Sequence, residues 1–291
     1  MVATLDLSRT AGDAAEADAP HIVDVLIAER APRLSRSWAW PLARPLLYRL
    51  LDYRKARAMA DRVARAGGLA AMDYASELLD LSVAATGLER APAKGRVIVV
   101  VNHPTGLADG VAVDDVLKRV RPDRIYFANA DARRISLSLD EIFIPVEWVE
   151  AKRTRDTLRL TVRLAQEALE AERALVIFPS GRISRRRNGV LADLPWASSA
   201  LSLARRYHAP VLPIHLAGPP SRLFGLFDRV SSELRDITLF HELLNKHGAA
   251  FRLTTGPLIP PEAIGHPGET TQRLKAYVEE VLPLHPDQPF A

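Results

Sequence analysis

The chain has 291 residues, of which 48% are hydrophobic and 25% charged, and this composition argues against a disordered, collagen-like or coiled-coil chain. It contains no cysteine, which excludes disulfide bonds, thiol catalysis and thiolate metal ligation. No apolar run approaches the ~20 residues of a membrane-spanning helix, and the first residues lack the basic start and apolar block of a secretory signal. We therefore expect a cytoplasmic protein whose contact with a membrane is peripheral.

Charge is distributed unevenly along the chain. Residues 1–29 hold six acidic residues and one basic residue, whereas residues 30–65 hold ten basic residues against two acidic ones. The second segment thus carries a net charge of +8, twice the +4 of the whole chain. A basic segment of this kind attracts a polyanion, which is a nucleic acid, an anionic bilayer or an acidic protein.

The first part of the chain is predicted to be helical after an acidic tail. Residues 1–20 are rich in alanine and acidic residues and show no apolar period, so we expect disorder there. Across residues 21–90 apolar side chains recur at helical spacing, with one helix ending at Gly67 and Gly68 and a second at Gly87. The sequence that follows, at 91–95, is a turn or linker.

Residues 91–291 show a different pattern, in which short apolar strands alternate with helices. Strands are predicted at 96–101, 125–128, 142–146, 174–178, 211–216 and 251–255, and helices at 109–120, 155–172, 196–207 and 270–281. On the helix at 155–172, Leu158, Val162 and Leu169 share one face, which we expect in the core. The alternation predicts an α/β fold with a mixed, largely parallel central sheet flanked by helices and preceded by the N-terminal helical segment.

The first candidate loop follows the strand at 96–101 and reads Asn-His-Pro-Thr-Gly-Leu-Ala-Asp, residues 102–109. His103 and Asp109 meet only if Pro104 and Gly106 fold the chain into a turn, because six positions on a continuous helix separate two side chains by about 240°. An Asp beside an imidazole fixes its tautomer and raises the basicity of the other nitrogen. This arrangement predicts a general base.

The second candidate loop follows the strand at 174–178. It contains Ser180, Gly181, Arg182 and Arg185, and a glycine-bearing turn flanked by arginines is a plausible anion site. The alternative is a solvated basic loop. The eight histidines show no ligand spacing, so we expect no metal.

Taken together, the two loops resemble the lysophospholipid acyltransferase superfamily. The family pattern is Asn-His, four residues and Asp after a buried strand, then Phe-Pro-Glu-Gly-Thr-Arg-Ser and a proline-containing apolar strand. Here Asn102-His103 is present, Ser180 follows His103 by 77 residues, and 211–214 supplies the last strand. Five residues rather than four separate His103 from Asp109, Ser180 replaces the Glu, and Ile183 stands where the family has its phosphate-binding Arg. The pattern is similar to the hemolysin-like and ornithine-lipid O-acyltransferase branch.

The resemblance implies an O-acyltransferase that moves a fatty acyl group from an acyl thioester to the hydroxyl of a lysolipid. His103 takes the hydroxyl proton and Asp109 orients the imidazole, without a cofactor. The acyl donor is coenzyme A-bound or carried by acyl carrier protein, and the acceptor is lysophosphatidate, another lysophospholipid or a lyso-ornithine lipid. The expected substrate-binding residues are Asn102, Gly106, Ser180, Gly181, Arg182 and Arg185.

The basic segment then suits an anionic membrane surface. Trp38, Trp40, Tyr48 and Tyr53 are interleaved with arginines and leucines, as in interfacial helices. We therefore expect peripheral binding to the inner face of the membrane, and we expect no nucleic acid because no nucleic-acid module is present.

Two alternative functions remain open. A serine hydrolase using Ser180 is one, although the loop lacks the Gly-x-Ser-x-Gly elbow. The other is a non-catalytic membrane-binding protein on the same fold.

Overall fold

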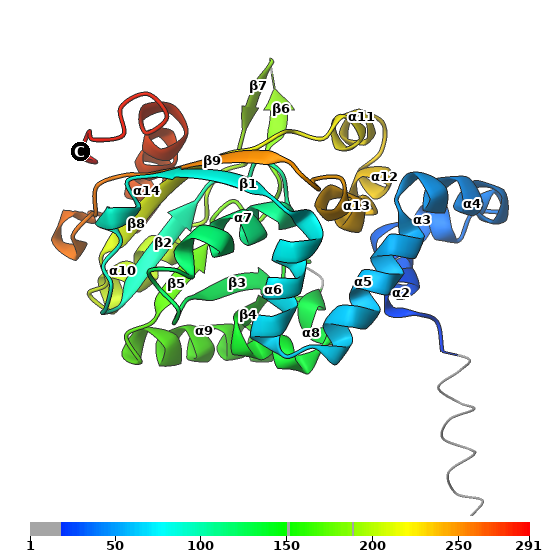
Figure 1. The fold of residues 1–291 in the computed structure, drawn as a ribbon, viewed down its shortest axis with the longest axis horizontal. Helices are drawn as coiled ribbons and strands as arrows, with labels where there is room; N and C mark the ends of the chain where they lie inside the picture. The colour runs from blue at the N-terminus through cyan, green and yellow to red at the C-terminus, as the bar shows by residue number, and fades with distance from the viewer. Residues whose placement is uncertain (1–18, 150–151, 188) are drawn as a thin grey trace, which may run out of the picture.

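The computed structural model describes residues 19–149, 152–187 and 189–291. The predicted acidic tail thus lies almost entirely outside the described residues. Within them the chain folds around a seven-stranded sheet in the order β1-β9-β8-β2-β5-β3-β4 (Figure 1). The strands are β1 (Ser82–Thr86), β2 (Val97–Val101), β3 (Ile125–Asn129), β4 (Phe143–Val146), β5 (Ala174–Ile177), β8 (Val211–Ala217) and β9 (Ala250–Thr255).

Most of the sheet is parallel. Strands β8, β2, β5, β3 and β4 run in one direction, whereas β9 is antiparallel to β8, and β1 is parallel to β9. The predicted α/β fold with a mixed, largely parallel sheet is confirmed.

Strand β2 shows why the sheet is buried on both faces. Its five residues are all β-branched and have no exposed surface. Successive side chains point to opposite faces of a sheet, so Val97, Val99 and Val101 belong to one hydrophobic core while Ile98 and Val100 belong to the other. Apolar runs without polar alternation are typical of parallel strands covered on both sides.

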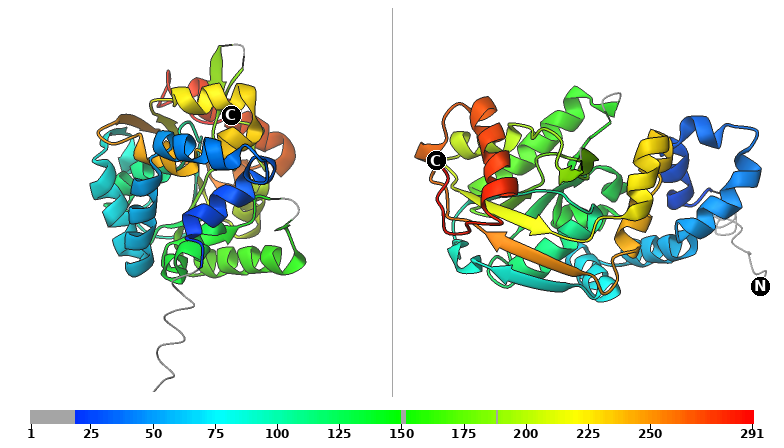
Figure 2. Two further views of the ribbon diagram at one scale, coloured as in Figure 1. Left: turned by 90° about the vertical axis from the view of Figure 1, so that its right-hand side faces the viewer. Right: turned by 90° about the horizontal axis from the view of Figure 1, so that it is seen from above.

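Helices supply both covers (Figures 1 and 2). The core on the Val99 face includes buried residues of α6 (Gly68–Leu79), α7 (Leu107–Leu117) and α13 (Leu239–Leu244). The opposite core includes those of α9 (Arg155–Glu170), α10 (Ser199–Arg206), α14 (Pro267–Ala276) and the π-helical turn η5 (Tyr277–Val281).

The N-terminal helices lie at one end of the molecule, beside α13 and far from α10 and α14 (Figures 1 and 2). They are α2 (Ile22–Arg30), α3 (Pro32–Ser35), α4 (Trp40–Leu50) and α5 (Tyr53–Arg65). Ion pairs join α2 to α8 (Asp131–Ile135), with Arg30 Nη2 2.6 Å from Asp131 Oδ2 and Glu29 Oε2 2.7 Å from Arg134 Nη1. Within the described ranges, every helix falls short of the length and apolarity that crossing a bilayer requires.

Several elements were not predicted. They are α8, α11 (Arg222–Val230), α12 (Ser232–Asp236), α13, the short turns η1 (Leu88–Arg90), η2 (Leu137–Glu141) and η4 (Pro261–Ala263), and the hairpin of β6 (Arg185–Arg187) and β7 (Val190–Ala192). The hairpin replaces the basic loop expected at 182–187, and α11 to α13 occupy the connection between β8 and β9.

Two expectations are wrong. Residues 82–86 form edge strand β1 beside β9 rather than the end of a helix, so the sheet begins ahead of the boundary at 90 and 91. On α9, Leu169 is buried, but Leu158 is 64% exposed and Val162 42% exposed. The apolar face of α9 is thus covered in its second half and open in its first half.

Candidate functional site

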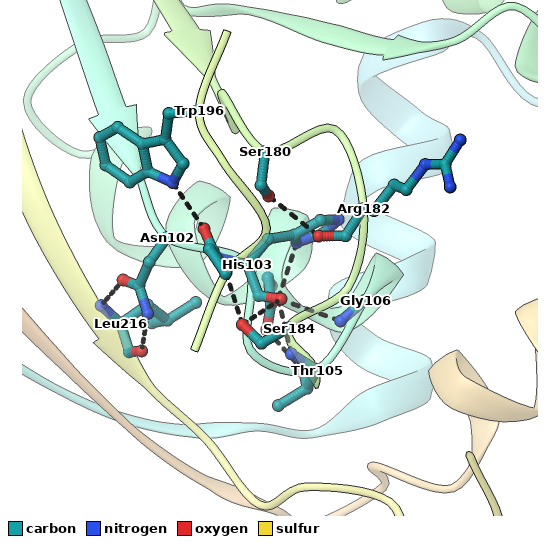
Figure 3. A network of polar contacts seen from close by, with 11 residues as sticks. Asn102, His103, Thr105, Gly106, Ser180, Arg182, Ser184, Trp196 and Leu216 are labelled. Carbon is teal, nitrogen blue, oxygen red and sulfur yellow. Dashed lines mark hydrogen bonds and ion pairs between the residues drawn. The ribbon is translucent and has the colours of Figure 1, made fainter. Parts of the chain in front are cut away.

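The two candidate loops lie side by side because their strands do. Strands β2 and β5 are parallel neighbours, with Val100 opposite Ile177, so both chains leave the sheet at the same edge. This carboxyl edge is where α/β sheets place their sites. The network that results is drawn in Figure 3.

The first loop closes on the carboxylate of Asp109. Gly106 has a φ of +103° and caps the N-terminus of α7. Asp109 Oδ2 accepts the backbone N–H groups of Thr105 and Gly106 at 2.9 and 3.0 Å, Oδ1 accepts the Thr105 hydroxyl, and His103 Nδ1 lies 2.8 Å from Oδ2. The predicted contact between His103 and Asp109 is therefore present, and the turn at Gly106 makes it.

This geometry fixes the imidazole tautomer. A carboxylate only accepts hydrogen bonds, so in the neutral imidazole His103 Nδ1 carries the proton and Nε2 has the lone pair. No hydrogen bond among the described residues involves Nε2. Asp109 is fully buried, whereas His103 keeps 17% of its side chain exposed. The dyad thus presents a proton acceptor at the surface, which is what a general base requires.

The aromatic ring of Phe178, at the end of β5, packs against this imidazole. The two ring centroids are 4.6 Å apart, with an angle of 34° between the planes. The contact limits the ring positions available to His103, because an imidazole that tilts away would lose both Phe178 and Asp109.

The peptide groups of His103 are held by residues that the sequence did not single out. Asp193 Oδ1 and Oδ2 lie 3.1 and 3.2 Å from His103 N, and the His103 carbonyl accepts Ser184 N at 2.8 Å. Ser184 also donates its hydroxyl to Asp193, and Trp196 Nε1 donates to Asp193 at 2.9 Å. Ser184 precedes β6 and Asp193 follows β7, so both ends of the hairpin are fastened to the backbone of the candidate base.

Asn102 is placed differently from the expectation. It is 5% exposed, its Nδ2 donates to the Leu216 carbonyl at 2.9 Å, and its Oδ1 accepts Leu216 N at 2.6 Å. Its amide therefore joins the end of β2 to β8 and is not free to bind substrate. The backbone N–H of Gly106 is likewise used by Asp109, and a Cβ at Gly106 would lie 2.8 Å from Ile183 Cδ1.

The second loop does not form the anion cradle that its sequence suggested. The Gly181 N–H donates to the Phe178 carbonyl at 2.9 Å, and a Cβ at this position would overlap Trp148 at 2.0 Å. Gly181, with a φ of +60°, is required by the tight turn and by close packing. The Ser180 hydroxyl donates to the Arg182 carbonyl at 2.9 Å, so no base among the described residues activates it. This geometry disfavours the serine hydrolase.

The two arginines differ in setting. The side chain of Arg182 is exposed and extends away from the network in Figure 3. Arg185 is 21% exposed, its Nε lies 3.6 Å from Asp228 Oδ1, and burial lowers the pKa of its guanidinium. Arg185 also lines a pocket of about 300 Å³ between the first loop and α11, together with Pro104, Thr105 and Glu242. Of the expected anion-binding residues, Arg185 thus lines this cavity.

A metal site is not indicated by the described residues. Within 19–149, 152–187 and 189–291, no three His, Asp or Glu side chains gather in a way that could hold a metal ion.

Comparison with known proteins supports the interpretation of the two loops as those of an acyltransferase. Residues 82–217 match the model of the family described as Acyltransferase. Lyso-glycine lipid O-acyltransferase of Bacteroides thetaiotaomicron is 25% identical over 221 residues, which cover 74% of this chain and 79% of that protein. The protein of the same name from Phocaeicola vulgatus is 27% identical over 199 residues, covering 66% and 70%.

Among solved structures, the 1-acyl-sn-glycerophosphate acyltransferase PlsC from Thermotoga maritima aligns over 91% of this chain and 98% of its own, with 16% identity and a TM-score of 0.48. The family match over residues 82–217 and the two sequence relatives support the lysophospholipid acyltransferase superfamily. The chain is an acyltransferase.

Proposed function

We propose that the protein transfers a fatty acyl group from an acyl thioester to the hydroxyl of a lysolipid, with His103 as general base and Asp109 as its orienting partner. The observation that carries this proposal is the 2.8 Å contact between His103 Nδ1 and Asp109 Oδ2. It leaves Nε2 as the acceptor on the exposed side of the ring. The lyso-glycine lipid acyltransferases that resemble the chain support a lysolipid as the acceptor.

The reaction follows from this arrangement. The acceptor hydroxyl donates to His103 Nε2 and attacks the thioester carbonyl carbon, and its proton moves to Nε2 as the new ester bond forms. The carbon–sulfur bond breaks, and the imidazolium returns the proton to the departing thiolate. Asp109 stabilises the imidazolium while it exists, and general-base assistance of this kind accelerates a reaction about 10²–10⁴-fold.

We place this reaction at the inner face of the membrane, with α4 as the contact. Trp38 is 86% exposed, and Leu42, Leu46 and Leu50, which recur every four residues along α4, are 76%, 71% and 45% exposed. Arg44 and Arg49 lie on the same helix. An exposed apolar stripe flanked by arginines favours binding to an anionic bilayer.

The remaining aromatic residues of this segment support the helices instead. Tyr48 and Tyr53 stack with centroids 4.0 Å apart, and both hydroxyls donate to Asp24. Trp40 packs edge-on to Tyr48. They fix α4 and α5 on α2, so that the leucines of α4 remain at the surface.

The test is product formation by the purified full chain. Acyl-CoA and acyl carrier protein thioesters are offered separately, each with lyso-glycine lipid, lyso-ornithine lipid or lysophosphatidate in anionic vesicles. Mass spectrometry should show one acyl mass added to at least one acceptor. Release of free fatty acid at the same rate with and without acceptor would instead support a hydrolase, and no turnover of any pair would support a non-catalytic protein.

A further inference from the structure

The pocket beside the first loop contains two buried polar atoms that lack a hydrogen-bond partner. In the described part of the chain, five buried side-chain polar atoms have no hydrogen-bond partner, and two of the five belong to residues lining this pocket. They are Arg185 Nε, a donor, and Glu242 Oε1, an acceptor. Buried polar atoms are nearly always paired, and an unpaired one is costly. These two unpartnered atoms therefore indicate a bound group that supplies an acceptor to Arg185 Nε and a donor to Glu242 Oε1.

Glu242 is built into this position. It is 1% exposed, on α13, and its Oε2 lies 3.5 Å from Nζ of the equally buried Lys246. Lys246 balances the carboxylate charge from one side and also donates to Asn245 Oδ1 at 2.7 Å. Burial raises the pKa of Glu242. The Ser221 hydroxyl lies near this carboxylate and opposes the rise of its pKa, but no side chain or backbone group of the described residues completes a hydrogen bond to the second oxygen, Oε1.

The charges around the pocket constrain what enters it. Its lining holds four basic residues and two acidic ones, namely Arg185, Arg186, Arg222, Arg229, Asp228 and Glu242. Asp228 Oδ1 is paired with Arg235 at 3.0 Å and lies 3.6 Å from Arg185 Nε, an ion pair too long for a hydrogen bond. The excess of positive charge suits a negative group, while the free oxygen of Glu242 demands a hydrogen-bond donor beside it.

We propose that this pocket binds an amino-acid head group of the acceptor lipid, with its negative group at Arg185 and its nitrogen donating to Glu242. The assignment rests on the proposed function, because the pocket borders Thr105 of the loop that carries the dyad. The ionised phosphate of lysophosphatidate can accept a hydrogen bond from Arg185, but it has no donor for Glu242. The free hydroxyl of that lipid is not available as a donor, because it is the group that reacts. The pocket thus selects lipids in which a nitrogen lies close to the anion.

Binding is tested apart from transfer by ligands that cannot be acylated. Isothermal titration of the full chain compares N-dodecanoylglycine with tetradecanoate, which has a carboxylate without nitrogen, and with dodecyl phosphate. N-dodecanoylglycine should bind about tenfold more tightly than either, as expected for one hydrogen bond to a charged group. Glu242→Gln should reduce this preference to about threefold or less, and Arg185→Gln should weaken all three ligands alike.

The matched control is Glu167→Gln, the same change on the exposed face of α9, which should leave every affinity unchanged. Equal affinity of the wild-type chain for N-dodecanoylglycine and tetradecanoate would overturn the proposal, and this comparison holds even if Glu242→Gln fails to fold. Acyl transfer without this preference would refute the head-group assignment alone. The preference without acyl transfer would keep the assignment and refute the proposed function.

Discussion

Replacing Asp193 by Asn tests whether the hairpin positions the candidate base. The carboxylate accepts three donors, namely His103 N, the Ser184 hydroxyl and Trp196 Nε1. A hydrogen bond to a charged acceptor is stronger than a neutral one by about 1 kcal/mol. Three weakened bonds, partly offset because a neutral amide is easier to bury, should lower the free energy of unfolding by about 2 kcal/mol.

The catalytic effect of Asp193→Asn should exceed what this loss of stability explains. Displacing a reacting group by about 1 Å can cost about 10²-fold in rate, so we expect kcat to fall 10- to 100-fold, with the KM for the thioester unchanged. Urea unfolding and initial-rate measurements check both quantities, and Asp156→Asn at the exposed start of α9 is the control. A folded Asp193→Asn protein with kcat within twofold of wild type would refute the positioning role.

Three further changes probe separate parts of the structure. Asp114→Asn should destabilise the fold by about 3–5 kcal/mol in urea, because Arg124, buried and paired with Asp114 at 2.6 Å, then lacks its counterion. Ser180→Ala should keep acyl transfer within about threefold of wild type, since its hydroxyl serves only the turn carbonyl. Replacing Leu42 and Leu46 together by Asp should weaken sedimentation with anionic vesicles at least tenfold. Burial of each leucine side chain in the bilayer interface contributes about 1.5–3 kcal/mol to the binding free energy.

Each of the three has its own decisive contrast. For Asp114, an unfolding midpoint equal to wild type would show that the buried ion pair is dispensable. For Ser180, complete loss of turnover or a trapped acyl-serine would support the serine hydrolase. For α4, Leu158→Asp on α9 is the control, because Leu158 is similarly exposed, and equal losses from both helices would move the membrane contact away from α4.

The strands and the dyad could be predicted because local signals determine both. Strand β2 is an unbroken β-branched run, which few other structures accommodate. His103 and Asp109 are brought together by a turn whose Gly106 is visible in the sequence, and the extra residue in the spacing is accommodated there. By contrast, β1 has the sequence Ser-Val-Ala-Ala-Thr and lies at an exposed edge, so neither its composition nor its periodicity separates it from the preceding helix.

What sequence reasoning missed depends on contacts between distant residues. Asp193 lies 90 residues from His103, and an acidic residue in a loop has no local feature that distinguishes a buried carboxylate from a solvated one. Glu242, on helix α13, likewise has no local sequence feature that marks it as buried. The apolar periodicity of α9 identified an apolar face, but not which part of that face other elements cover. The exposure of Leu158 was therefore not predicted.

The most direct test of the account is the turnover of His103→Ala. With the thioester and acceptor that the wild-type chain uses, the variant should lose acyl transfer by about 10²–10⁴-fold. It should remain folded, because the buried Asp109 carboxylate keeps the Thr105 and Gly106 N–H groups and the Thr105 hydroxyl as donors. Near wild-type turnover by the folded His103→Ala protein would contradict the proposed mechanism, in which the His103 imidazole is the base.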